Sequence, residues 1–425
     1  MSNFKFYERD QPLLLPIDLR EWVAGDDLVH FIIEACERLD MSAFHVSRTG
    51  SGMAQYHPRM MLALLVYCYA SGIFSSRRIE QATYRHISVR YIAANTHPDH
   101  DTIAKFRRDN AAAFTAAFAQ ILLLAKEMNI LKVGMVSVDG TKIDANASKI
   151  KSLRYDRIQA LRAQLETDIK DLMARAEGAD ASNESDGLSL PEEITRRKTL
   201  KAKLDAAAKR LEAACKAGSH DDDPGPPPGE KQTNLTDPDS AIMRKSVRHE
   251  YRQAYNAQAI VDADGSQLIL GTNVLVTSND RAGFEGMIEA LCAGPGKPDT
   301  LLADAGYASG PLVSALEKRG INPLVAISRT QTPRCYDFRP PPDDPRPPKN
   351  ITAPWRLAMQ QKLHTEDAKQ KYRKRKSTVE PVFGIIKSIL GFKQFHLRGI
   401  DKVKNEWNLV ALAYNCKRLA KISAA

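Results

Sequence analysis

Apolar residues recur every three to four positions in three stretches near the start of the chain, residues 28–39, 60–73 and 111–131. This spacing is typical of helices that bury one face. Pro58 sits where a helix tolerates proline, since the first N–H groups of a helix have no partner within it. The pattern therefore predicts an all-helical N-terminal domain over residues 1–130.

Two shorter basic segments lie between these helices. Ser75 and Asp99 each precede a run that predicts a short helix, and both are residue types that cap helix N-termini. Short helices joined by a tight turn suit insertion into DNA, with arginines holding phosphates. The alternative is a small helical domain whose charges only face water. The arginines expected to bind DNA are Arg77, Arg78, Arg107 and Arg108.

The pattern changes to strands after residue 130. An apolar, β-branched run ends on Asp139, which a glycine follows at once. We interpret it as a buried strand that delivers Asp139 to a sheet edge, although Asp-Gly is also a common turn. A second Asp-Gly pair, at 264–265, lies between apolar runs over 254–261 and 267–274 and predicts a β-hairpin.

Helices and strands alternate after this hairpin. Asn279-Asp280 is expected to cap a helix, and a strand over 300–303 ends on Asp304. A helix over 311–319 and a strand over 323–327 follow. This order predicts an α/β fold with a mixed sheet flanked by helices.

A polar segment interrupts the strands. Leucine and isoleucine at helical spacing over 149–216 predict a helical hairpin, whose middle at 177–191 is loop-like. Residues 220–229 are rich in Pro, Gly and Asp, which predicts a mobile tract. We therefore interpret 150–235 as a helical insertion into a second domain that spans 131–425.

The last part of the chain begins with a segment crowded by prolines, 331–354, which excludes regular structure. Helical patterning returns at Trp355 and again in the tail over 406–419. Pro381 disfavours helical backbone at Glu380, so Glu380 is expected to cap a helix or to sit at a kink. At a helix N-terminus the helix dipole would keep its carboxylate ionised.

The composition indicates what kind of partner the protein binds. The 425 residues carry a formal net charge of +10 and a pI near 9.2. This favours an anionic partner, with nucleic acid ahead of a membrane. The six cysteines form no C-x-x-C pair, which predicts reduced thiols without zinc. The apolar run over 13–17 is too short for a signal peptide or a membrane span, so a cytoplasmic location is expected.

Three carboxylates stand out, because Asp139 and Asp304 each follow a strand and Glu380 lies at a helix after the sheet. If they converge, their repulsion favours hard cations with oxygen ligands. Two Mg²⁺ ions about 3.5–4 Å apart would activate a water or a 3′-hydroxyl and stabilise the leaving oxygen. Lys387, two helical turns beyond Glu380, would place an ammonium beside that site. Four other carboxylates remain as alternatives: Asp144, Asp262, Asp264 and Asp280.

Four motifs in order carry a resemblance to bacterial insertion-sequence transposases of the DDE type. They are Val138-Asp139-Gly140-Thr141-Lys142, Tyr255-Asn256-Ala257-Gln258, Ala303-Asp304-Ala305-Gly306-Tyr307 and Thr378-Val379-Glu380-Pro381-Val382-Phe383-Gly384. The stretch from His57 to Arg107 resembles the helical N-terminal domain of the same family, so the likeness covers nearly the whole chain. It implies an RNase H-like catalytic domain with an insertion. That family usually places the insertion later in the fold than this chain does.

The resemblance also implies roles. Asp139, Asp304 and Glu380 become the catalytic, metal-binding triad for two Mg²⁺ ions, with Mn²⁺ a possible substitute. The signature Tyr-x-x-Arg-x-x-x-Glu-x-x-x-x-x-x-Lys maps onto Tyr372, Arg375, Glu380 and Lys387, which are expected to bind DNA. Four residues rather than three separate Arg375 from Glu380, and Lys376 occupies the strict position, so either cation is a candidate.

The implied function is that of a DNA transposase. It would bind the terminal inverted repeats of its insertion sequence, cleave them by Mg²⁺-dependent hydrolysis and transfer the 3′-hydroxyl ends to target DNA. Double-stranded DNA is the expected partner, the protein acting as a homodimer, associated with the bacterial nucleoid when bound and with no membrane partner. Two alternatives remain: an RNase H-like nuclease without strand transfer, and an inactive DNA-binding repressor derived from a transposase.

Overall fold

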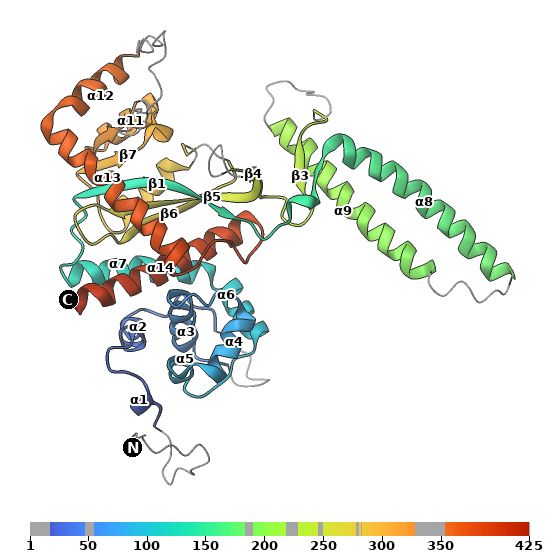
Figure 1. Cartoon of the computed structure of the whole chain (residues 1–425), viewed down its shortest axis with the longest axis horizontal. Coiled ribbons are helices and arrows are strands. Elements are labelled where there is room, and N and C mark those ends of the chain that lie inside the picture. The colour runs from blue at the N-terminus through green and yellow to red at the C-terminus, as the bar shows by residue number, and fades with distance from the viewer. Residues whose placement is uncertain are drawn as a thin grey trace, which may run out of the picture. The chain divides into compact units, whose positions relative to one another are not determined.

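The computed structural model describes residues 18–46, 55–182, 190–217, 228–244, 250–277, 280–281, 283–327 and 353–424. The chain divides into a helical unit, Met1–Met128 with Leu409–Ala425, and a sheet unit, Asn129–Asn408 (Figure 1). The division differs from the expected domain bounds at the C-terminal end. There, the last 17 residues group with the N-terminal helices, whereas the sequence placed all of 131–425 in one domain.

Short capped helices make up the helical unit. Side chains of Asp27, Ser75 and Asp99 accept N–H groups of the first turns of three helices, as the sequence predicted for the last two. The sequence pattern did not predict the six-residue helix α5. The helices are α1 (Leu19–Trp22), α2 (Leu28–Glu37), α3 (Pro58–Ala70), α4 (Ser76–Arg85), α5 (Ile87–Ile92), α6 (His100–Asp109) and α7 (Ala111–Glu127), with the end of α14 (Ile400–Ser423).

A mixed sheet forms the core of the other unit and confirms the predicted fold class. Its central strand β1 (Met135–Asp144) runs antiparallel to β5 (Arg252–Asp262) and parallel to β7 (Thr300–Ala303). β8 (Asn322–Val325) extends the parallel side, while β4 (Ala241–Met243) and β6 (Ile269–Leu275) both pair with the far edge of β5. Each strand buries apolar side chains, which accounts for its β-branched runs.

The strand that carries Asp139 does not end there, so that part of the sequence interpretation was wrong. β1 continues to Asp144, because every residue after Asp139 keeps a partner on β5. On its other side, however, β1 pairs with β7 only from Met135 to Ser137. β7 ends at Ala303, and the chain turns at Asp304 into the short 3₁₀ helix η3 (Ala305–Tyr307). Asp139 therefore lies where the sheet loses a strand, with one edge open towards Asp304.

Helices α10 (Phe284–Ala293) and α11 (Gly310–Lys318) connect the later strands. The cap expected at Asn279-Asp280 was wrong. α10 begins only at Phe284, after Gly283 in the left-handed region at φ 74°. Asn279 lies outside the described residues, and the Asp280 side chain contacts the sheet instead of a helix end.

The insertion forms the predicted helical hairpin. α8 (Tyr155–Ser182) and α9 (Leu190–Ala217) lie side by side and share a small apolar core that includes Ile158, Leu204 and Ala208 (Figure 1). The loop-like middle expected over 177–191 was predicted too wide, because α8 continues to Ser182 and α9 begins at Leu190. A two-stranded ladder of β2 (Ser152–Arg154) and β3 (Gln232–Asn234) closes the base of the hairpin.

Helix α13 (Glu366–Gly384) follows α12 (Pro354–His364) and contradicts one of the two positions expected for Glu380, that of a helix cap. The helix continues through Pro381, so Glu380 neither caps a helix nor lies near a helix N-terminus. Proline removes the N–H that would bond to the carbonyl of Ser377. That carbonyl accepts from Gln267 Nε2 at 3.1 Å, which replaces the lost bond. A π-helical turn, η4 (Ile385–Ile389), then carries Lys387.

Two predicted irregular segments, the tract over 220–229 and the proline-crowded segment over 331–354, lie almost entirely outside the described residues. Within the described part of the chain, no helix is both long enough and apolar enough to cross a membrane.

Candidate active site

Burial raises the pKa of Asp139 above the ordinary value of an aspartate. The charge of Asp304 helps to raise the pKa of Asp139, and burial is the larger cause. Together with smaller effects they raise that pKa to about 6, while the N–H of Gly140, which donates to Asp139 Oδ1 at 2.8 Å, acts in the opposite direction. A buried carboxylate with a second one nearby is costly to ionise, and a cation would relieve that cost.

Helix α13 carries Glu380, and Arg375 on the same helix connects Glu380 with Asp139. Arg375 Nη1 donates to Asp139 Oδ2 at 3.3 Å, and its Nη2 lies 3.8 Å from Glu380 Oε1. The Arg375 side chain is 13% exposed and that of Glu380 is 55% exposed. Arg375 therefore faces into the sheet and offsets the charge of Asp139, while Glu380 lies at the rim.

A fourth acid, Asp280, lies beside Gly140 of β1 and Gly306 of η3. Of the four alternatives that the sequence left open, only Asp280 joins the other three acids: its charge also raises the pKa of Asp139. A Cβ placed on Gly140 would lie 2.8 Å from Asp280 Oδ1, and one on Gly306 would lie 2.7 Å from its Oδ2 and 2.9 Å from Asp304 Oδ1. We call Asp139, Asp280, Asp304 and Glu380 the acidic cluster.

The other three carboxylates have different partners. Asp144 forms an exposed ion pair with Arg252 at 3.1 Å. Asp262 accepts from Ser266, and Asp264 accepts from the N–H of Met135, at the opposite end of β1 from Asp144. None of these contacts leads to Asp139 or Asp304.

The remaining signature residues differ in what they contact. Tyr372 is half-buried against the sheet core, and its hydroxyl donates to the carbonyl of Ala303 at 3.1 Å. This position favours holding α13 on β7 over stacking on a base. Lys376 is exposed, whereas Arg375 reaches two members of the acidic cluster. Lys387 Nζ donates to the hydroxyl of Thr141 and to the carbonyl of Lys142, so it fastens η4 to β1.

A groove of about 880 Å³ adjoins the cluster. Four acids, Asp139, Asp144, Glu250 and Glu380, lie in its wall together with four cations. A chain of phosphates could enter such a groove, because the cations would offset its charge beside the acids. The cationic side chains are Lys142, Arg252, Lys387 and Lys393.

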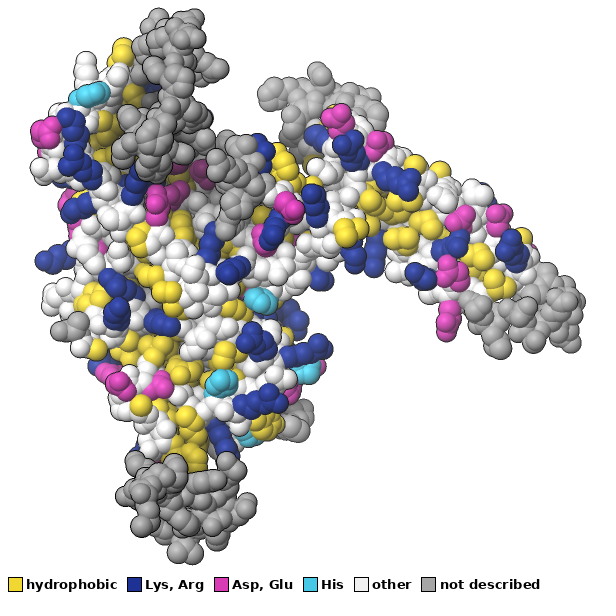
Figure 2. All heavy atoms as spheres, viewed as in Figure 1, with side chains coloured by type: hydrophobic (Ala, Val, Ile, Leu, Met, Phe, Trp, Pro, Cys, Tyr) yellow, Lys and Arg dark blue, Asp and Glu magenta, His cyan; other side chains and the backbone are white. Residues whose placement is uncertain are grey.

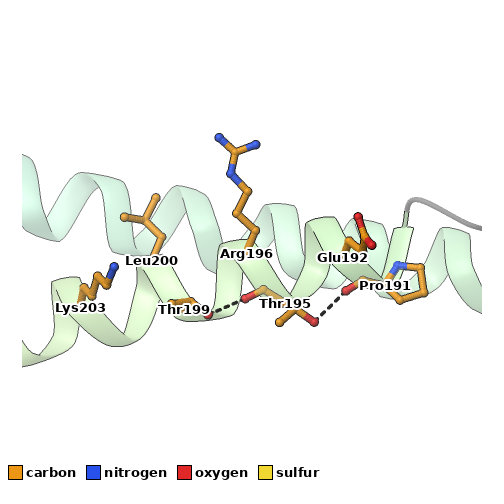
Figure 3. A pocket seen from close by; sticks show the side chains of 7 residues that line it. All are labelled: Pro191, Glu192, Thr195, Arg196, Thr199, Leu200 and Lys203. Carbon is orange, nitrogen blue, oxygen red and sulfur yellow. Dashed lines mark hydrogen bonds between the residues drawn. The ribbon is translucent and has the colours of Figure 1, made fainter. Parts of the chain in front are cut away.

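A second hollow, of about 690 Å³, lies along α9 and belongs to a different region (Figure 3). One face of α9 from Pro191 to Lys203 lines it, and no member of the acidic cluster does. Figure 2 shows Lys and Arg mixed with Asp and Glu along the hairpin, which agrees with the ion pairs of Arg162 with Asp205 and Arg197 with Asp168. This mixed charge does not define a binding site.

The arginines of the helical unit also separate into two groups. Arg77, Arg78 and Arg108 are exposed on α4 and α6. Arg107 is buried, and its Nη1 donates to the hydroxyl of Tyr69 at 2.7 Å and to a main-chain carbonyl at 3.1 Å. Burial favours a packing role for Arg107 over the expected contact with DNA.

The donors in the acidic cluster fit a hard divalent cation, since carboxylate oxygens are the ligands that Mg²⁺ prefers. The spacing is wider than a closed metal site needs. Across the described residues, no three His, Cys, Asp or Glu side chains gather closely enough to hold an ion.

An RNase H-like α/β fold with acids from β1, from the turn after β7 and from α13 defines a nucleic-acid-processing class. Comparison with known families agrees: a Transposase DDE domain matches residues 227–416, and a Transposase domain (DUF772) matches residues 18–109. The chain belongs to the insertion-sequence DDE transposase family. Asp304 and Glu380 lie within the first match and Asp139 lies outside both. Searches of curated proteins and of solved structures gave no match.

We predict that Gly306→Ala lowers the free energy of unfolding by about 1–3 kcal/mol, since its methyl group overlaps the carboxylates of Asp280 and Asp304. Urea denaturation measures the change. Gly286→Ala, within helix α10 and with no atom within 4 Å of the new methyl group, is the control and should be neutral or stabilising. Equal destabilisation by both would contradict the close packing at Gly306.

A second prediction follows from the pKa of Asp139, which is about 6 against an ordinary value near 3.8. In metal-free buffer the folded state resists ionisation. The wild-type protein should therefore lose stability relative to Asp139→Asn as the pH rises from about 4 to 6, by up to about 3 kcal/mol. Urea denaturation at pH 3.5, 5 and 7 measures this difference.

Asp144→Asn, on the same strand but outside the acidic cluster, is the control for the loss of a carboxylate. A wild-type-to-variant difference that stays constant with pH for Asp139→Asn, or that falls equally for Asp144→Asn, would show that Asp139 is not held in a costly ionised state.

Proposed function

We propose that the protein is the transposase of an insertion sequence that cleaves the terminal inverted repeats of its element and transfers the freed ends to target DNA. The observation that carries this proposal is that Arg375 contacts both Asp139 and Glu380, while the charge of Asp304 acts on Asp139. Family membership supplies DNA as the substrate class.

The reaction has two chemically related steps. In the first, water attacks a phosphorus at the end of the element, the P–O3′ bond breaks, and a 3′-hydroxyl and a 5′-phosphate result. In the second, that 3′-hydroxyl attacks a phosphodiester of the target strand, a new O3′–P bond forms and the target's own O3′ leaves. Both steps exchange one phosphate ester bond, so one set of acids serves both.

Asp139, Asp304 and Glu380 would hold divalent metal ions, which transposases of this family normally use. Bound Mg²⁺ polarises the phosphate and lowers the pKa of the attacking group. The chain's own contribution is orientation. β1 fixes Asp139, and the turn after β7 fixes Asp304. Arg375 aligns α13 with these two aspartates. When cations take the place of its guanidinium, Arg375 can move to a DNA phosphate.

The groove beside the acids would receive the DNA strand that is cut. Lys142 and Lys393 would contact its phosphates, while Lys387 keeps η4 on β1. Exposed arginines on α4 and α6 would bind the inverted repeat. We propose a homodimer in the DNA complex, because two element ends must be joined to one target.

Asp139→Asn should bind a duplex carrying the element end as tightly as the wild-type protein does, while cleavage falls by at least about a thousandfold. A gel-shift assay and a radiolabelled cleavage assay in Mg²⁺ measure the two properties. Asp401→Asn, an exposed residue in the first turn of α14 that does not line the groove, is the control, which should cleave. Cleavage by Asp139→Asn at the wild-type rate would refute the triad.

The same assay with pre-cleaved ends separates transposition from simple nuclease action. A transposase joins these ends to a target plasmid, whereas an RNase H-like nuclease leaves them unjoined. A protein retained only as a repressor would bind the duplex but produce neither product.

The helical unit offers a separate test. Changing Arg77 and Arg78 together to glutamine should weaken binding to the element end and reduce the slope of log affinity against log salt by about one to two, since each lost phosphate contact removes about one unit. Fluorescence anisotropy over a range of salt measures it. Arg38→Gln, an exposed residue paired with Glu34 on α2, is the control and should leave the slope unchanged. An unchanged slope in the double variant would exclude α4 from the interface.

A further inference from the structure

Two buried amides lie in the middle of β5, where an apolar side chain would be expected. Asn256 is 1% exposed and Gln258 is fully buried. They are two residues apart and so share a face of the sheet. Gln258 lies opposite Gly140, and Asn256 lies opposite Lys142, on the neighbouring strand β1. The proposed reaction assigns neither of them a role.

Both amides reach the segment that carries Asp280. Asn256 Nδ2 donates to Asp280 Oδ1 at 2.6 Å, and Gln258 Nε2 donates to the main-chain carbonyl of Asp280 at 2.7 Å. The same Gln258 nitrogen donates to the hydroxyl of Tyr307 at 3.0 Å. One strand therefore holds the side chain and the backbone of Asp280 and, separately, the end of η3.

These contacts converge on the turn at Asp304. The N–H of Gly306 donates to Asp304 Oδ1 at 2.8 Å, and Arg281 Nε donates to the carbonyl of Gly306 at 3.3 Å. Tyr307, which completes η3, is fully buried. Asp280 fills the space beside Gly306, where a methyl group would collide with it. Fixing the Asp280 segment and Tyr307 therefore fixes the carboxylate of Asp304 between them.

We propose that Asn256 and Gln258 are positioning residues for the proposed active site: through Asp280 and Tyr307 they hold the Asp304 turn against β1, so that the Asp304 carboxylate stays beside Asp139. This inference rests on the proposed function. It also gives a physical role to the Tyr255-Asn256-Ala257-Gln258 motif. Asp280 then serves as the link between β5 and the turn.

Another amide on the same strand serves as a matched control. Gln253 is also buried, at 4% exposed, and its side chain bonds to Ser240 and Ser152 near the base of the hairpin. Neither of these bonds reaches the acidic cluster. Gln258→Met and Gln253→Met each remove one hydrogen-bonded amide from β5. A purely structural role would therefore give both variants the same effect on the site.

The test uses the full chain and two measurements. Isothermal titration of Mn²⁺ into the metal-free protein gives the metal affinity, and cleavage at increasing Mg²⁺ gives the concentration for half-maximal rate. Gln258→Met should weaken Mn²⁺ binding about tenfold or more and raise the Mg²⁺ requirement by a similar factor, which is typical for losing a residue that orients ligands. Gln253→Met should leave both values within about twofold, although it too lowers the unfolding midpoint.

Asn256→Ala provides a second variant if Gln258→Met does not fold. It should also weaken Mn²⁺ binding, and it should have no further effect in a chain that already carries Asp280→Ala, because it acts through that carboxylate. Equal Mn²⁺ affinity in Gln258→Met and Gln253→Met, or additive effects of the changes at 256 and 280, would overturn the positioning role. A wild-type protein that binds Mn²⁺ without cleaving DNA would refute the proposed function and leave this test intact.

Discussion

Mutual repulsion among carboxylates is the constraint on which the site depends. Burial raises the pKa of Asp139 and of Asp280, the charge of Asp304 raises both further, and no flexible loop would keep these acids together without help. The sheet supplies that help. β1 holds Asp139 from one side through β5, and the parallel pairing of β1 with β7 stops two residues before it. The gap leaves room for the Asp304 turn while the backbone on both sides stays fixed.

How much of this the sequence predicts depends on how local each feature is. The hairpin at Asp262–Gly265, the strand before Asp304 and the mixed sheet follow from local patterns, and the fold class is confirmed. The end of β1 was placed wrongly, because a strand ends where its partners end and partners are distant in sequence. The same reason hides Asp280 among several candidates, since its position beside Gly140 depends on a contact with Asn256 of β5, 24 residues earlier in the chain. The catalytic roles stay predictions.

Pro381 shows a second way in which tertiary structure overrides a local rule. Proline should break the helix before Glu380, yet α13 continues. The side chain of Gln267 replaces the missing N–H, because its Nε2 donates to the carbonyl of Ser377. Gln267 comes from the hairpin between β5 and β6, more than a hundred residues away. A continuous α13 is what lets Arg375 and Glu380 approach Asp139 from one rigid element, so the hairpin supports the acidic cluster at a distance.

The departure from the family signature then has a geometric meaning. Residues five apart on an α-helix point about 140° away from each other, whereas residues four apart share a face. Arg375 is nearly buried against Asp139, so Glu380 must lie to the side, which agrees with its exposed carboxylate at the rim of the groove. An arginine side chain is long enough to contact both acids across that angle, and a metal ion is not. In the proposed reaction, closing the site around cations would therefore require Arg375 to leave Asp139 and the Glu380 side chain to rotate inward, and an incoming DNA phosphate would be the partner for the released guanidinium.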